Sequence, residues 1–548
     1  MHHPTTLPRL LAALLLGLLA VPLAWSLWQA MLAGADDAGW SALWHDPQTR
    51  PALGASLWTG LASTALATAS AAWVLSRSST QAALQRLVQR QAWMLAVPHA
   101  AFAMGLVLLI APSGWLLRLL SPWATGLESP PPWPTTQDPW GLGLVVALAL
   151  KEIPFLLWAA GAHLLRPDVA QRLNQELQVA ATLGYGTHQA WWRIVWPQLL
   201  PRIATPLLAV LAYSLTVVDV ALVIGPATPP TLAVLAWQWL QDADAVANAK
   251  GAAAAWLLAG SVAASAVLAW ALLQAPLWRH RRTRGVVVRV AHTRKVPSSP
   301  LPLAPIYLAV LAALLLGSLT GPWPFPQLWP TAWTLAAWHS VAQSSSTVWV
   351  TIALGTASAT CALLWVVAWL ELAPPRWHAR MPTLVYVPLL LPALLWVLGL
   401  HRLALAWELD GSAIGVWLTH TLACLPYVLL TLQGAYTGFD ARLYSVAATL
   451  GHGRWSFVWR IKWPLLRASI ASAFAVGFAV SVAQYLPTLY VGAGRFATVT
   501  TEAVTLASGG QRSLMAAFAW LQWLLPAGMF GLAAWFGSSR AFPVAKGQ

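Results

Sequence analysis

The hexapeptide Val-Ala-Ala-Thr-Leu-Gly occupies residues 179–184 and recurs letter for letter at residues 446–451. The match continues downstream, where Trp-Arg-Ile, one variable position and Trp-Pro fill residues 192–197 and 459–464. Both copies lie in basic segments between long apolar runs. We therefore expect two related membrane domains, each of which presents one copy of this sequence to the same side of a bilayer.

The composition is that of a polytopic membrane protein. Hydrophobic residues make up 58% of the 548 residues and charged residues only 9%, too few to cover the surface of a soluble protein of this size. Whole runs of about 20 residues lack any charge, which is the length one helix needs to cross a bilayer. Both cysteines, Cys361 and Cys424, lie within apolar runs, so no disulfide framework is expected.

Hydropathy predicts an all-α polytopic membrane protein with twelve transmembrane helices. The predicted spans are 10–33, 54–76, 92–112, 141–164, 203–225, 252–276, 303–321, 346–370, 382–400, 413–433, 468–490 and 513–536. A basic stretch follows the sixth span, so we expect a first membrane domain at residues 1–277, a cytoplasmic linker at 278–302 and a second membrane domain at 303–548. The first apolar run has no small-residue cleavage site, and we expect it to be retained as a helix.

The positions of Lys and Arg predict the orientation in the membrane. Most of the 31 basic residues lie in segments that are cytoplasmic if the N-terminus is cytoplasmic, and a dense group runs from Arg279 to Lys295. Because cytoplasmic segments carry the excess of Lys and Arg, both termini are predicted to lie in the cytoplasm. The net charge of +15 and the 37 tryptophans favour contact with anionic lipid and the membrane interface over binding to nucleic acid.

The two halves are predicted to be parallel repeats. Each half has an even number of spans, so both enter the membrane from the same side and are related by an axis along the membrane normal. Two further pairs support a duplication: Pro98 with Pro388 in the third and ninth spans, and Pro154 with Pro426 in the fourth and tenth. The predicted architecture is therefore two parallel six-helix repeats.

The repeated stretch is predicted to form a short helix that ends in a tight turn. Asp168 and Asp440 are candidate N-terminal caps, and Gly184 and Gly451 are candidates for the left-handed residue that ends a helix. The paired alanines between them give a surface with little side-chain bulk, which another backbone can approach closely. A second, amphipathic piece follows in each copy and stops at a proline.

These residues resemble the cytoplasmic loop of binding-protein-dependent ABC importer permeases. The pattern of that family is Glu-Ala-Ala, three variable positions, Gly, nine variable positions, Ile, one variable position and Leu-Pro. Its Gly, Ile and Pro occur at the family spacing as Gly184, Ile194 and Pro197, and again as Gly451, Ile461 and Pro464. The chain departs from the pattern at three places: Gln178 and Ser445 replace the Glu, Val179 and Val446 the first Ala, and Trp196 and Trp463 the Leu.

The resemblance extends over both halves and is closest to fused permeases of the thiamine and ferric-iron type, in which one chain supplies both membrane domains of a type I ABC importer. It implies that each repeated stretch is a coupling helix that docks on one of two copies of a separate ATP-binding subunit, which holds the ATP and Mg. The implied coupling residues are Gln178, Val179, Ala180, Ala181, Gly184, Ile194 and Pro197, and Ser445, Val446, Ala447, Ala448, Gly451, Ile461 and Pro464. It also implies a periplasmic or extracellular solute-binding protein and a place in the bacterial inner membrane.

The chain itself is not expected to be an enzyme. It contains no Gly-x-x-x-x-Gly-Lys-Ser/Thr loop that would hold nucleotide phosphates, so ATP hydrolysis is expected on the partner subunit. Carboxylates in the external loops are scattered, which argues against a membrane enzyme. The alternative is a secondary transporter with twelve spans in parallel six-helix repeats, although such a protein has no reason to repeat a cytoplasmic loop.

Ionisable groups within the predicted spans are few. Lys151 and Glu152 lie midway through the fourth span and Asp219 lies in the fifth, with Gln484 in the corresponding region of the second half. Charged side chains inside a membrane carry a large desolvation penalty, so these positions are candidates for the substrate pathway. The alternative is a structural pair of Lys151 with Glu152 or Asp219, and the sequence leaves both open.

No metal site is predicted in this chain. His99 and His420 have no second His, Cys or carboxylate at helical spacing. We expect both side chains to pack within the helix bundle.

Overall fold

The computed structural model describes residues 6–78, 80–274, 301–378, 381–385, 388 and 391–538, and nearly all of the linker predicted at 278–302 lies outside them. The described part is helical, with one isolated β-bridge between Thr320 and Trp333. The helical elements of the first half are α1 (Thr6–Gly34), α2 (Asp37–His45), α3 (Thr49–Arg77), α4 (Gln81–Leu95), α5 (His99–Ile110), α6 (Trp115–Leu120), α7 (Leu142–Leu164), α8 (Pro167–Thr182), α9 (Thr187–Ala190), a π-helical turn (Trp191–Val195), α10 (Trp196–Leu199), a 3-10 turn (Leu200–Ile203), α11 (Ala204–Thr216), α12 (Asp219–Ile224), α13 (Leu232–Leu240) and α14 (Ala245–Gln274). Those of the second half are α16 (Leu303–Gly317), α17 (Ala336–Gln343), α18 (Ser345–Leu372), α19 (Pro375–His378), α20 (Met381–Val385), α22 (Ala393–Ala406), α23 (Ala413–Thr437), α24 (Arg442–Thr449), α25 (Arg454–Phe457), a π-helical turn (Val458–Lys462), α26 (Trp463–Val482), α27 (Leu486–Val491), α28 (Val499–Ser508) and α29 (Arg512–Ser538).

Nine helical stretches of the described part are long and apolar enough to cross a membrane. They are Leu7–Gly34, His99–Leu120, Leu142–Leu164, Thr187–Thr216, Ala245–Gln274, Ser345–Leu372, Ala413–Thr437, Arg454–Val482 and Arg512–Ser538. The other predicted spans, 54–76, 303–321 and 382–400, fall on α3, α16 and α22. α3 is long enough, but its many Ala, Ser and Thr residues make it less apolar, and α16 and α22 are shorter, at 15 and 14 residues. The chain is thus a polytopic helical membrane protein.

The same neighbours occur in both halves. α3 packs on α7 and α11, as α18 packs on α23 and α26. α13 packs on α14 as α28 packs on α29, and α12 packs on α5 as α27 packs on α22. Small residues allow close approach in this packing, since a Cβ at Gly60 in α3 would lie 2.6 Å from a methyl carbon of Leu215 in α11. The helices of the first half therefore have counterparts in the second half with equivalent neighbours.

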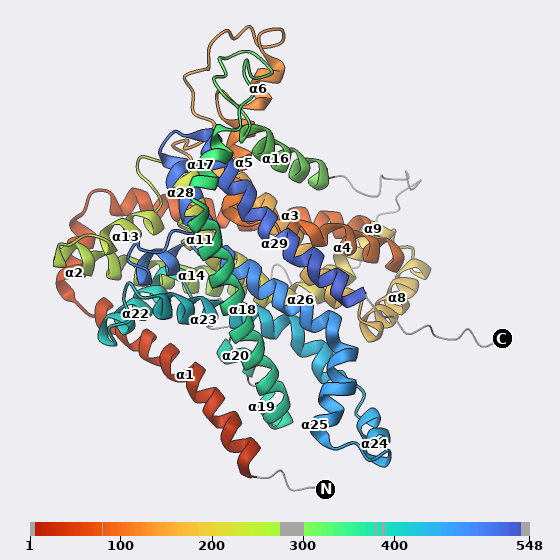
Figure 1. Cartoon of the computed structure of the whole chain (residues 1–548). Helices are drawn as coiled ribbons and strands as arrows, with labels where there is room; N and C mark the ends of the chain where they lie inside the picture. Colours follow the sequence, from red (N-terminus) through yellow and green to blue (C-terminus); the bar gives the residue numbers. More distant parts are fainter. Residues whose placement is uncertain are drawn as a thin grey trace.

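The first helix of each half packs against the other half (Figure 1). α1 runs along α22 and α18, and α16 runs along α5. Glycines permit both crossings: a Cβ at Gly399 in α22 would lie 1.9 Å from the carbonyl oxygen of Ser26, and one at Gly105 in α5 would lie 2.7 Å from that of Val310. One hydrophobic core cluster accordingly draws residues from both halves.

The same glycines correct one predicted correspondence. Pro98 precedes α5 and Pro392 precedes α22, each with an extended backbone, and Gly105 and Gly399 lie equally far into the two helices. The counterpart of Pro98 is therefore Pro392 and not the predicted Pro388. Pro388 and Pro392 lie close together in the sequence, and only Pro392 directly precedes the start of α22.

The predicted spans 203–225 and 468–490 are each interrupted. A short gap separates α11 from α12, where Val217 has an extended backbone with ψ of 134°, and another separates α26 from α27. An interruption leaves backbone groups without helical partners, which membranes tolerate only where protein or a water-filled cavity surrounds them. Both interruptions therefore mark the interior of the bundle.

Candidate functional site

Both copies of the repeated stretch end a helix with the same hydrogen-bonded turn. Gly184 follows α8 with φ of 85°, and Gly451 follows α24 with φ of 82°. The backbone bonds are equivalent, all at 3.0 Å: Tyr185 N to Ala180 O, Gly184 N to Ala181 O, His452 N to Ala447 O and Gly451 N to Ala448 O. In this Schellman arrangement a left-handed residue lets the last turn satisfy its own carbonyl groups. The left-handed glycines predicted from the sequence are confirmed.

Each repeated helix buries the same alanine and presents apolar side chains to the surroundings. Ala180 and Ala447 are 3% and 2% exposed and pack inward. The outward positions are equivalent in the two copies: Val179 (60% exposed), Leu183 (64%), Val446 (57%) and Leu450 (73%), with Gln178, Ala181, Ser445 and Ala448 beside them. Exposed apolar side chains at the same place in two repeats mark an interaction surface. Leu183 and Leu450 join this surface although the family pattern leaves their positions variable.

Of the two predicted caps, Asp440 caps α24, since its Oδ1 accepts a hydrogen bond from the backbone amide of Arg442 at 2.9 Å. Asp168 lies inside the first turn of α8 and is not its N-terminal cap. Pro167 is the first residue of α8, so Arg166 takes the position before the helix. Asp168 instead pairs with Arg166 at 3.1 Å, and Asp440 pairs with Arg442 at 2.8 Å. The hydrogen bonds from Arg442 hold the pKa of the Asp440 carboxyl below its usual value. Both are exposed ion pairs, which contribute little to stability.

A π-helical turn follows each repeated helix at the same place. It spans Trp191–Val195 in the first copy and Val458–Lys462 in the second, and the amide of the next tryptophan bonds five residues back in each. Within or just after these turns lie Ile194, Pro197, Ile461 and Pro464. Proline has no amide hydrogen, and its ring clashes with the carbonyl four residues earlier in an α-helix, which the wider turn accommodates. The sequence did not predict these turns.

Glu371, near the end of α18, ties the second loop to the bundle. Its carboxylate accepts hydrogen bonds from Lys462 Nζ and from the Tyr436 hydroxyl, both at 2.6 Å. Arg454 donates to the Glu371 carbonyl oxygen at 2.7 Å. The side chains of Glu371 and Lys462 are only 10% and 15% exposed, so this is a largely desolvated cluster. It joins the loop to two spanning helices, α18 and α23.

The first loop is anchored differently. Glu176, within α8, accepts a hydrogen bond from Gln198 Nε2 at 2.6 Å and lies 3.7 Å from Arg172. α8 also has 16 residues, whereas α24 has 8. The two loops therefore share their final turn and exposed face, while their attachments to the bundle differ.

His99 connects the predicted carboxylates inside the membrane. Its Nε2 lies 2.9 Å from Oε1 of Glu152, and its ring lies against Tyr213 with centroids 4.6 Å apart. Asp219 lies close enough to interact with His99 electrostatically. The His99 side chain is 35% exposed, so this cluster is not sealed within the core. The sequence predicted only packing for His99, because its partners come from other helices.

Lys151, next to Glu152 in α7, has different direct partners. Its Nζ donates to the carbonyl oxygen of Met94 at 3.2 Å and lies 5.9 Å from the centre of the Tyr307 ring. The side chain is only 4% exposed. Among the described residues Lys151 forms no ion pair with Glu152 or Asp219, although Glu152 lies close enough to interact with it electrostatically.

The second half places uncharged groups at the equivalent positions. α12 begins at Asp219 and α27 at Leu486, so Leu486, and not Gln484, is the counterpart of Asp219. Gln484 lies in the gap after α26, and its amide donates to the Val480 carbonyl oxygen of α26 at 3.0 Å. The buried His420 is bonded to two hydroxyl groups, each at 2.8 Å. The counterpart of Asp219 in the second half is therefore uncharged.

Two tyrosines of the second half complete the surroundings of the carboxylates. Tyr427, midway along α23, lies close enough to interact electrostatically with Glu152, and Tyr485 with Asp219. Tyr427 is 38% exposed, so its ring borders open space. The carboxylates are thus faced by aromatic hydroxyl groups from both halves.

The fold and the paired loops are those of a polytopic membrane permease. Sequence similarity to known proteins shows which class of permease it is. The chain is 38% identical over 505 residues to the inner membrane ABC transporter permease protein YnjC of Escherichia coli K12, which covers 91% of each chain. It is 30% identical over 184 residues to ModB, a molybdenum transport system permease protein of Mycobacterium bovis, covering 30% of this chain and 68% of ModB. It is also 30% identical over 98 residues to PotC, a spermidine/putrescine transport system permease protein of Haemophilus influenzae, covering 17% of this chain and 38% of PotC. No family model matches the sequence.

The chain therefore belongs to the ABC transporter permeases. It is a membrane permease of an ABC importer, and the alternative of a secondary transporter is not supported. The resemblance that the repeated loops carry is confirmed at the level of this family.

Proposed function

We propose that this chain is a fused permease of the thiamine and ferric-iron type, which supplies both membrane domains of an importer as two parallel six-helix repeats. The relatives support fusion, because 68% of ModB aligns with only 30% of this chain, whereas YnjC aligns over 91% of it. The equivalent helix contacts and the two exchanged first helices, α1 and α16, support the repeats. In this proposal α3, α16 and α22 complete the twelve spans.

In this proposal α8 and α24 are coupling helices, and each docks on one copy of an ATP-binding subunit. The observation that carries it is the shared geometry of the two loops, in which the same turn presents Val179 and Val446 outward. Small and apolar residues on an exposed helix face fit a groove of a partner protein. ATP and Mg bind to that partner, and ATP hydrolysis takes place there.

The orientation follows from the charges. The loops and both termini face the cytoplasm of a bacterial cell, because Lys and Arg gather in the segments on that side of the inner membrane. A solute-binding protein then delivers substrate to the opposite face. The basic linker rests on anionic headgroups at the cytoplasmic surface.

The substrate pathway runs between the halves, past Glu152 and Asp219. His99, with a side chain that is 35% exposed, and Tyr427, which is 38% exposed, support this position. Lys151 has a structural role in this proposal, and Gln484 borders the interruption of the second half. Two carboxylates faced by tyrosine rings suit a cationic solute better than an anionic one.

The test is co-purification of the permease with its ATP-binding subunit. Val179→Glu and Val446→Glu place a charge on the exposed face of either coupling helix without disturbing its turn. Each is expected to weaken binding of the ATP-binding subunit at least about tenfold, because an unpaired charge is buried in the contact. Gln171→Glu, on an exposed position of α8 two turns earlier, is the matched control. Wild-type binding by both Val variants would disprove the coupling role.

A further inference from the structure

Two hollows lie at equivalent places in the two halves. The first, of about 430 Å³, lies between the end of α5, the loop after α16 and the start of α29; the second, of about 360 Å³, lies between the end of α1, the start of α14 and α22. The residues that line the two hollows occupy equivalent positions in the two halves. The pairs, with the residue of the first hollow given first, are Gly317 and Ala33, Thr320 and Asp36, Arg512 and Ala245, and Leu108 and Arg402. Arg512 and Ala245 are as far apart in the sequence as the two copies of the repeated loop.

The hollows open at the end of the molecule opposite to the loops. α29 ends beside the start of α26, where Arg467 Nε donates to the Gly537 carbonyl oxygen at 3.3 Å, and α26 begins directly after the second loop. At 1.5 Å per residue, the 27 residues of α29 place Arg512 about 40 Å from that contact. α6 and α17 mark this end in Figure 1. By the proposed orientation, the hollows face the side from which substrate arrives.

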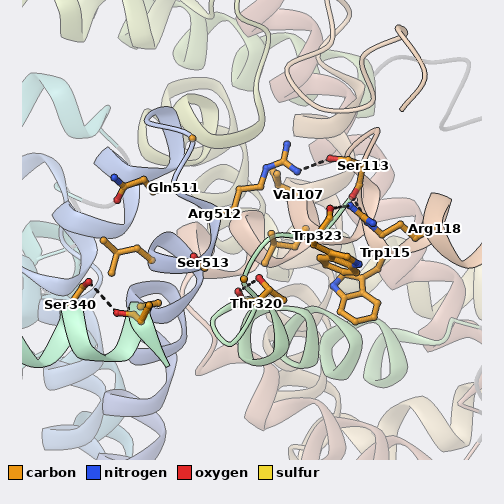
Figure 2. Close-up of a pocket in the computed structure, with 17 residues that line it drawn as sticks. Val107, Ser113, Trp115, Arg118, Thr320, Trp323, Ser340, Gln511, Arg512 and Ser513 are labelled. Atoms are coloured by element: carbon orange, nitrogen blue, oxygen red, sulfur yellow. Dashed lines mark hydrogen bonds between the residues drawn. The ribbon is translucent and has the colours of Figure 1, made fainter. Parts of the chain in front are cut away.

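The first hollow is basic. Its charged lining residues are Arg118 and Arg512. Arg118 is 4% exposed and donates to four backbone carbonyls, those of Ser113, Trp323, Pro324 and Gln327. Arg512 is exposed, and Figure 2 shows it reaching Ser113, whose neutral hydroxyl accepts from Nη1 at 2.7 Å. Arg118 therefore shapes the wall of the hollow, while Arg512 presents its charge at the surface.

The second hollow is acidic. Its charged lining residues are Asp36, Asp242 and the partly buried Arg402. Asp36 and Asp242 are exposed, and each uses one carboxylate oxygen for a backbone amide at 3.0 Å, which leaves its second oxygen for another partner. Exposed Asp37 and Asp244 lie near them in the chain and add to the negative charge. The sign of the charge is thus reversed between two equivalent hollows.

We propose that the two hollows receive the two lobes of the solute-binding protein, and that their opposite charges decide which lobe sits on which half. This inference rests on the proposed function, in which such a protein delivers the substrate. The lobe over α29 carries Asp or Glu toward Arg512, and the lobe over α14 carries Lys or Arg toward Asp36 and Asp242. In this orientation each lobe meets a hollow of opposite charge and is attracted to it. In the reverse orientation each lobe would meet a hollow of like charge and be repelled.

The physical reason is the near-twofold relation of the two halves. A two-lobed binding protein that closes about a hinge could dock on such a surface in two orientations related by a half-turn. Two hollows of equal charge would attract both lobes alike. To favour one docking orientation over the other, the two hollows must carry opposite charge at equivalent positions. The arginine of α29 and the aspartates before α2 and α14 supply this difference.

The test measures binding of the solute-binding protein that supports ATP-driven uptake with this chain, using permease in lipid nanodiscs. Arg512→Glu and the double variant Asp36→Lys with Asp242→Lys are each expected to weaken binding about tenfold at low salt, with a smaller effect at high salt. Arg495→Glu, an exposed arginine outside both hollows, is the control and is expected to bind like wild type. Arg512→Gln separates loss of charge from its reversal.

Orientation is read by cross-linking from a cysteine at Gln511 in each permease to a cysteine in either lobe. Wild type is expected to link to one lobe, and the triple reversal of Arg512, Asp36 and Asp242 to the other. Equal linking of both lobes by wild type, or equal weakening by Arg512→Glu and Arg495→Glu, would overturn the inference. Wild-type permease that binds no solute-binding protein at all would instead overturn the proposed function on which it rests.

Discussion

The ammonium group of Lys462, in the π-helical turn after the second coupling loop, lies 2.6 Å from Oε1 of Glu371 in α18. This pair links the loop to the membrane helices. Glu371→Gln removes the negative charge and keeps the size of the side chain. We expect ATP-driven uptake in proteoliposomes to fall at least about fivefold while ATP hydrolysis by the complex falls less, because in the proposed function this pair transmits the motion of the loop to the helices and the substitution weakens it.

The control for this prediction is Asp440→Asn. Asp440 forms an exposed pair with Arg442 at 2.8 Å, next to the same loop. Such exposed surface pairs contribute little to stability, so uptake is expected to stay near the wild-type level. Equal losses for Glu371→Gln and Asp440→Asn would show that Glu371 has no special part in coupling.

The left-handed turn of the second loop predicts a graded response at Gly451. Its φ is 82°, and no atom lies within 4 Å of a Cβ built there, so only backbone strain opposes a substitution. Gly451→Val is expected to raise the energy of the turn by about 1–2 kcal/mol and to weaken binding of the ATP-binding subunit, whereas Gly451→Asn is expected to be tolerated because Asn adopts this conformation more readily. If Gly451→Val and Gly451→Asn weakened binding of the ATP-binding subunit equally, the size of the added side chain and not backbone strain would explain the effect, and this prediction would be wrong.

The crossing of α1 over α22 predicts a stability effect at Gly399. A Cβ there would lie 1.9 Å from the carbonyl oxygen of Ser26, and a backbone atom cannot rotate away. Gly399→Ala is expected to destabilise the protein by about 1–3 kcal/mol, seen as a lower melting temperature in detergent. Gly54→Ala, in α3, meets no atom within 4 Å and is expected to leave the melting temperature unchanged or higher. Equal melting temperatures for the two variants would exclude a tight crossing.

The loops could be predicted from the sequence because their determinants are local. The turn depends on Ala180, Ala181 and Gly184, which are close together in the chain, and the second copy repeats them. Glu371 could not be assigned in this way, because its partner Lys462 is 91 positions away and nothing in either segment points to the other. The packing of α1 and α16 against the opposite halves likewise depends on glycines in helices that are distant in the sequence.

The interruptions of the spanning helices were also outside the reach of hydropathy. The gap before Asp219 is only two residues long and wholly apolar, so a window of helical length averages over it. The sequence placed Asp219 and Gln484 in corresponding regions without settling which residue is the counterpart of Asp219, and the helix start identifies Leu486. The role of His99 required the neighbouring helices, since Glu152 and Tyr213 come from α7 and α11.

The asymmetry of the intramembrane cluster leads to the last prediction. Asp219 begins α12 directly after the interruption, while its counterpart Leu486 carries no charge. By the proposed function, the negative charge of Asp219 therefore acts on the substrate from the first half alone. Asp219→Asn is expected to lower uptake at least about tenfold while the response of ATP hydrolysis to the loaded binding protein persists, because in the proposed function Asp219 lines the substrate pathway and takes no part in coupling. Asp219→Glu keeps the charge and is expected to retain part of the uptake. Size-exclusion profiles and melting temperatures of both variants should match wild type; an unfolded Asn variant would assign Asp219 to structure, and normal uptake by a folded Asn variant would remove it from the pathway.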